Sequence, residues 1–104
     1  MSEAYDCQLT IALPAALEDE LLDLLRAHDE WVKGFSILHA EGFGAGAQQL
    51  STIEQVMGRS RRRLVQILMQ REFVEPLRVA VGERFSTTDM AWWLTPVLAF
   101  GRFA

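Results

Sequence analysis

The chain is poor in cysteine, in long apolar runs and in positive charge, and each shortage excludes a class of protein. With a single cysteine, Cys7, it cannot form an internal disulfide. Charged residues interrupt every apolar run well short of the roughly 20 residues of a membrane-spanning helix, and no leader-like segment opens the sequence. We therefore expect a cytoplasmic protein with no membrane insertion. The net charge of −4 repels phosphates, so we expect no nucleic acid partner.

Half of the residues are apolar, which is enough for one hydrophobic core. We expect one domain over residues 1–104. Alternation of apolar and polar residues predicts strands at 7–13, 31–42, 61–70 and 90–100, and helical spacing predicts helices at 14–27 and 73–85. The second helix tolerates Pro76 because this residue lies in its first turn, and Pro96 favours an edge position for the last strand.

This βαββαβ order is typical of an α+β ferredoxin-like sandwich, in which two helices cover one face of an antiparallel four-stranded sheet. A long insertion, about residues 42–60, separates the second and third strands. The other face of the sheet is still apolar, since it carries some of Leu38, Leu64, Leu68, Trp92 and Trp93. We expect that face to pack against copies of the chain in a symmetric oligomer. The alternative is a monomer with both tryptophans in its core.

The insertion contains signals of its own. Ser51 and Glu54 form a capping box, which predicts a short helix over Thr52–Met57 that ends before Gly58. Upstream of this helix, glycines confer backbone freedom and predict the mobile portion of the insertion, at Gly42, Gly44 and Gly46.

Arginines gather where the insertion meets the third strand. Guanidinium groups pair with phosphate or carboxylate through two parallel hydrogen bonds, so we predict a ligand or anion site from Arg59, Arg61, Arg63, Gly42, Gly44 and Glu54. Alternation places Arg61 and Arg63 on one face of the strand and Arg62 on the other. The alternative is a solvated basic edge that pairs with acids such as Glu41 and Glu54.

A metal site is the second candidate, because imidazole and thiolate are ligands that zinc and copper accept. His39 is the first choice for a ligand, joined by Cys7, by Glu41 or by the same histidine of a symmetry mate. The sequence contains neither CxxC nor HxxxH. A single cysteine is more often a small core residue than a ligand.

No serine, histidine and acid occur in a recognisable nucleophile setting, and no paired carboxylates face one another in the expected fold. We therefore expect a protein that is not an enzyme.

Two segments resemble a known family. "EGFG", Glu41–Gly44, resembles the turn that opens the partner-binding T-loop of the PII signal-transduction superfamily. "LSTIEQVMGRSRRR", Leu50–Arg63, is similar to a short branch of PII-like proteins that are often encoded beside heavy-metal efflux systems. The resemblance implies a regulatory trimer whose loop contacts a partner protein in response to a small ligand. It implies as an alternative a copper- or zinc-binding trimer linked to heavy-metal tolerance, and a ligand-free interaction module stays open.

The resemblance also bears on the cofactor, which stays open between a nucleotide and a metal. Nucleotide-binding PII proteins hold phosphates with a glycine-rich loop, which we expect between the third strand and the second helix. Here that connection is Gln70–Phe73, "QREF", and contains no glycine. Backbone amides there do not form the usual phosphate nest, which argues against a nucleotide.

Overall fold

The structure is a computed structural model that describes residues 4–42 and 60–104. The chain runs through β1, α1, β2, β3, α3 and β4, with a short 3₁₀ turn before each helix, so the predicted βαββαβ order is confirmed. The bounds are β1 Cys7–Pro14, η1 Ala15–Leu17, α1 Glu18–Ala27, β2 Ser36–Gly42, β3 Ser60–Met69, η3 Arg71–Phe73, α3 Val74–Arg84 and β4 Ala91–Pro96.

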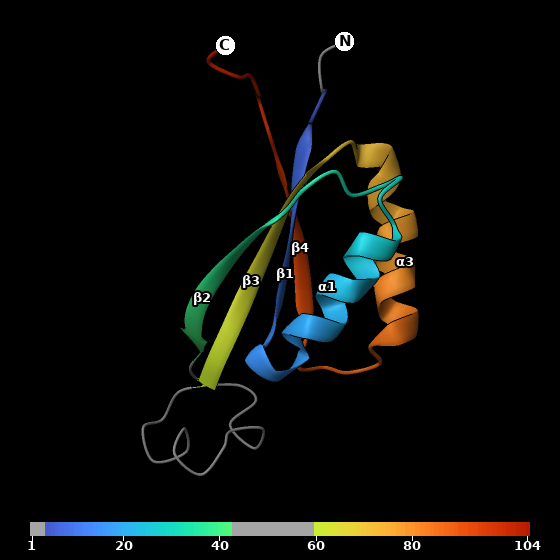
Figure 1. Cartoon of the computed structure of the whole chain (residues 1–104), viewed down its shortest axis with the longest axis vertical. Coiled ribbons are helices and arrows are strands. Elements are labelled where there is room, and N and C mark those ends of the chain that lie inside the picture. The colour runs from blue at the N-terminus through green and yellow to red at the C-terminus, as the bar shows by residue number, and fades with distance from the viewer. Residues whose placement is uncertain (1–3, 43–59) are drawn as a thin grey trace.

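The four strands form one sheet in the order β2-β3-β1-β4, and all neighbours are antiparallel. Both helices lie on the same side of this sheet (Figure 1), so the predicted ferredoxin-like α+β fold is confirmed. The last strand is an edge strand, as Pro96 indicated, because proline has no N–H to donate to a further neighbour.

The core lies between the helices and one face of the two central strands. Residues paired across strands point to the same side of the sheet, so alternate positions of β1 and β3 share the helix-covered face. The two helices and the turn after α1 supply the other layer. The buried apolar residues are Cys7, Leu9, Ile11, Leu13, Leu21, Leu22, Leu25, Val32, Val65, Ile67, Met69, Val74 and Leu77.

Two predicted strands are longer than the observed ones. The second begins at Ser36 and not at Trp31, because the N–H groups of Trp31 and Val32 both donate to the carbonyl of His28 at 3.0 Å and make a turn. The fourth ends at Pro96 and does not continue to Phe100. Pro76 lies in the first turn of α3, as predicted.

Some predictions concern the insertion and lie outside the described residues. They are the helix Thr52–Met57 with its capping box Ser51–Glu54, and the mobile portion at Gly44 and Gly46. The prediction was wrong for Gly42, which is the last residue of β2 and pairs with Ser60. Within the described ranges, neither α1 nor α3 is long and apolar enough to cross a membrane.

Candidate functional site

The two strands that flank the insertion stay paired up to its base. The last three pairs of the β2–β3 ladder are Ala40 with Arg62, Glu41 with Arg61, and Gly42 with Ser60. The ends of the insertion are therefore held at the spacing of neighbouring antiparallel strands, about 5 Å apart. We call these six residues, together with Arg63, the insertion base.

The arginines of the insertion base divide between the two faces of the sheet. Arg63 pairs with His39 and Arg61 with Glu41, which places both arginines on the helix-covered face. Arg62 points to the opposite face, which we call the free face. The alternation read from the sequence is thus confirmed by the register.

Arg63 fixes β3 to the start of α1. Its Nε donates to Oε1 of Glu18 at 2.7 Å, and its Nη1 donates to the carbonyl of Arg62 at 3.1 Å. The side chains of Arg63 and Glu18 are only 17% and 24% exposed. Glu18 is the first residue of α1, where a carboxylate also interacts favourably with the helix dipole. This ion pair is structural, and it holds the insertion base against the helical layer.

Arg62 makes a second link, across the free face. Its Nη2 donates to the carbonyl oxygen of Asp89 at 2.8 Å. Asp89 precedes β4, whereas Arg62 lies on β3, so the guanidinium reaches over the end of β1, where Pro14 is its ladder neighbour. The insertion base is therefore connected through one side chain to the segment between α3 and β4.

The other members of the predicted anion site are placed only in part. Arg61 and Glu41 lie opposite each other and are exposed, and Gly42 is half-buried. Arg59, Gly44 and Glu54 lie outside the described residues. The structure thus brings Arg61 and Arg63 to one face with His39 and Glu41, while Arg63 is already bound to Glu18. The anion site stays a prediction.

The two predicted metal ligands lie far apart in one chain. Cys7 pairs with Met69 and His39 with Arg63, so six positions of β3 separate them, about 20 Å along the strand. His39 is exposed at the insertion base, whereas Cys7 is buried in the core. Among the described residues, no group of three or more His, Cys, Asp or Glu could hold a metal ion.

The Cys7 thiol is buried and is expected to react slowly. It donates a weak hydrogen bond to the carbonyl of Met69 at 3.4 Å. Burial of the group and the neighbouring Asp6 carboxylate raise the pKa of the Cys7 thiol to about 11. A metal needs the thiolate, which is the minor form of Cys7 at neutral pH.

We accordingly expect Cys7 to resist alkylation in the folded protein. Because only the thiolate is nucleophilic, the rate of reaction with iodoacetamide should still be rising between pH 8 and pH 10 with no plateau, as expected for a pKa of about 11. The protein unfolded in urea is the control, and its rate should level off near the ordinary thiol pKa of about 8.5. A plateau near pH 8 in the folded protein would contradict this placement of Cys7.

The free face of the sheet carries apolar side chains that no helix covers. Leu38 and Trp93 are 42% and 44% exposed. Leu64 is half-buried between Leu38 and Ala12, and Leu68 is half-buried beside its ladder partner Gln8. Trp92 lies on the helix-covered face at the edge strand and is 49% exposed. Neither Trp92 nor Trp93 is therefore a core residue of the single chain, which argues against the alternative of a monomer with both in the core.

The connections on either side of α3 offer little to a phosphate. At Gln70–Phe73, the N–H of Arg71 donates to Oδ1 of Asp6 at 2.8 Å, and that of Phe73 donates to the carbonyl of Gln70. After the helix, residues 85–90 also contain no glycine, and the N–H of Asp89 is taken by Oγ1 of Thr87. Three backbone donors of the two connections, those of Arg71, Phe73 and Asp89, are thus already engaged and cannot contribute to a phosphate nest.

The sequence matches the model of one protein family over almost its whole length. The model of DUF3240, described as a protein of unknown function, matches residues 2–104. The chain belongs to the DUF3240 family. No curated protein matches the sequence. A crystal structure of a DUF3240 family protein from Shewanella baltica OS155 has a TM-score of 0.76 at 17% identity, with 98% of this chain and 100% of that chain covered.

Other solved structures that are similar to this DUF3240 chain are those of PII-like proteins. CPII, a nitrogen regulatory PII-like protein from Thiomonas intermedia K12 solved with ADP, AMP and bicarbonate, has a TM-score of 0.70 at 23% identity, with 95% of this chain and 96% of that chain covered. A protein from Thermus thermophilus, described as PII-like, has a TM-score of 0.65 at 18% identity, with coverages of 93% and 91%. The DUF3240 chain therefore has the PII-like fold.

Sequence reasoning missed the two partners that hold the arginines, Glu18 and Asp89. A signal existed for Glu18, because a carboxylate at the start of a helix favours a nearby cation. None existed for Asp89, which binds Arg62 through its backbone carbonyl and not through its side chain.

Proposed function

We propose that this DUF3240 protein is a non-enzymatic regulatory trimer of the PII type. The observation that carries the proposal is the uncovered apolar free face of a sheet with the PII-like fold, centred on Leu38, Leu64 and Trp93. Contiguous apolar surface on a small protein usually marks an interface, and packing against copies of itself would satisfy all three chains by one closed symmetry.

In this proposal the insertion, residues 42–60, contacts a partner protein, and a small ligand at the insertion base controls that contact. The base is suited to such coupling, because Arg62 connects β3 to the segment before β4 and Arg63 connects it to α1. An anion that binds at Arg61 alters the charges around these two links. Ligand binding at the end of the insertion would thereby affect the segment before β4 and the start of α1.

The ligand is chosen from what CPII holds, namely ADP, AMP and bicarbonate. Of these, bicarbonate needs only a guanidinium and a few donors, whereas the nucleotides need a phosphate cradle. Because neither connection beside α3 contains a glycine and the N–H groups of Arg71 and Asp89 are engaged, we favour the small anion over the nucleotides. For the metal alternative, an exposed His39 supports at most a site shared between subunits.

The test is native mass spectrometry of the full chain, alone and with bicarbonate, ADP, AMP and zinc in turn. We expect a mass of three times the 11.8 kDa chain and ligand uptake in threes, lost in an Arg61→Met variant. Zinc uptake that disappears in His39→Ala would instead favour the metal-binding trimer. A monomer across micromolar concentrations would contradict both readings.

A further inference from the structure

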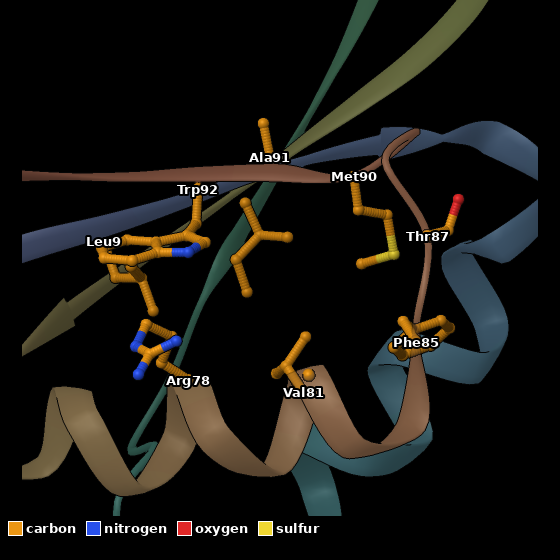
Figure 2. A pocket seen from close by; sticks show the side chains of 10 residues that line it. Leu9, Arg78, Val81, Phe85, Thr87, Met90, Ala91 and Trp92 are labelled. Carbon is orange, nitrogen blue, oxygen red and sulfur yellow. The ribbon is translucent and has the colours of Figure 1, made fainter.

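A cleft lies on the helix-covered side, between α3 and the edge strand β4, and is distinct from both the free face and the insertion base. Figure 2 shows Arg78, Val81 and Phe85 entering it from α3 and the segment after it, and Met90 and Trp92 from the opposite side. Its inner wall is formed by Leu9 and Ile11 of β1, and its volume is about 210 Å³. The lining is apolar apart from Arg78 and Thr87.

The cleft has one positively charged side chain in its lining, that of Arg78. The Cζ atom of Arg78 lies 5.5 Å from the ring centre of Trp92, a cation–π distance. Its guanidinium also donates to both carboxylate oxygens of Glu75, one turn earlier on the same helix. The Glu75 side chain is 67% exposed. A pair in which one partner is so exposed contributes little stability, so a ligand carboxylate can replace Glu75 at low cost.

The cleft stays open because position 82 has no side chain. Gly82 lies inside α3, where glycine is the costliest residue after proline. No steric conflict requires it, since a Cβ at this position would meet nothing within 4 Å. What a larger residue would take away is the space of the cleft, which Gly82 lines.

We propose that this cleft binds a small monocarboxylate with an aromatic or short aliphatic body. Apolar walls with one convergent polar group are typical of small-molecule sites. The guanidinium supplies a bidentate partner for the carboxylate, and the walls receive the body of the ligand. The volume sets the size: a cavity of about 150 Å³ holds benzene, so the cleft accepts a phenyl ring with a short acid arm and is too small for a nucleotide.

Phenylacetate is the probe, titrated into the full-length protein and followed by ¹H–¹⁵N NMR. From its size we expect a dissociation constant between about 0.1 and 1 mM. The amide signals of Val81 and Phe85 and the indole N–H signal of Trp92 should shift together. Phenylacetamide, which has the same shape without the charge, should bind about tenfold more weakly, a difference of ~1.4 kcal/mol.

Three variants separate the contributions. Arg78→Met keeps the apolar stem and removes the charge, so it should weaken phenylacetate about tenfold and leave phenylacetamide unchanged. Gly82→Leu should fill the cleft and abolish binding of both probes, while the helix gains a better helix former. Arg26→Met is the matched control, because Arg26 also pairs with an acid three residues earlier, Asp23, but on α1 and away from the cleft; it should bind like the unmodified protein.

The proposal is overturned if no signal shifts up to about 10 mM phenylacetate, if Arg78→Met binds as tightly as the unmodified chain, or if the shifts map to the free face. It does not depend on the regulatory trimer. A monomer that binds phenylacetate at this cleft would support the carboxylate site and contradict the proposed assembly.

Discussion

Leu38→Glu is expected to convert the proposed trimer into monomers at micromolar concentration. Leu38 is 42% exposed on the free face, next to Leu64 in the ladder, so the single chain tolerates a carboxylate there. In the proposed assembly, the same carboxylate would be removed from water once in each of the three chains. Each such burial costs several kcal/mol and so weakens the association of the subunits. Sedimentation velocity of the unmodified protein and of the Leu38→Glu variant measures the oligomeric state of each.

Val79→Glu is the matched control for this substitution. Val79 is 44% exposed, almost the same as Leu38, but it lies on α3 and not on the sheet. The Val79→Glu variant should remain trimeric. This result would show that the location of the new carboxylate on the free face, and not its charge alone, dissociates the Leu38→Glu variant. If Leu38→Glu is also trimeric, the free face is not the subunit interface, and a helical face becomes the candidate.

Breaking the pair between Arg63 and Glu18 is expected to lower stability more than breaking any exposed ion pair of the described residues. Removing one partner of a fully buried pair costs about 3–5 kcal/mol, and an exposed pair contributes about 0–1 kcal/mol. Arg63 and Glu18 are 17% and 24% exposed, between these limits. We therefore expect Arg63→Met to lower the free energy of unfolding by about 2 kcal/mol, measured by urea denaturation.

A double-mutant cycle shows whether this loss belongs to the pair. Glu18→Gln and the double variant should reveal a coupling of about 1–2 kcal/mol with Arg63→Met. Arg26→Met, which breaks an exposed pair with Asp23, should change stability by no more than about 0.5 kcal/mol. Additive losses from Glu18→Gln and Arg63→Met would mean that Arg63 acts through packing or through its bond to the Arg62 carbonyl.

The fold was predictable because its signals are local and repeat along the chain. The alternation in β1 and β3 specified which side of each strand is buried, and Pro96 specified an edge strand. The second strand was predicted too long because Trp31 and Val32 continue the apolar pattern. The apolar pattern does not predict that the N–H groups of Trp31 and Val32 donate to the carbonyl of His28 and form a turn.

The candidate sites were less predictable because they depend on partners far away in the sequence. The shared face of Arg61 and Arg63 follows from alternation, but the bond from Arg63 to Glu18 spans 45 residues. The distance between Cys7 and His39 became apparent only with the register of three strands. The cleft at Gly82 needed the packing of α3 against β4, which no pattern within either segment contains.

The ladder that closes at Gly42 and Ser60 makes the insertion energetically separable from the sheet. Once the stem is paired, the loop-closure entropy of whatever segment joins its two ends depends only on the logarithm of that segment's length. Shortening that segment roughly fourfold to a tight turn changes that term by only about 1 kcal/mol. Insertions of different length and composition can therefore be exchanged on this stem at little cost, so recognition of a partner is free to diverge while the sheet stays the same.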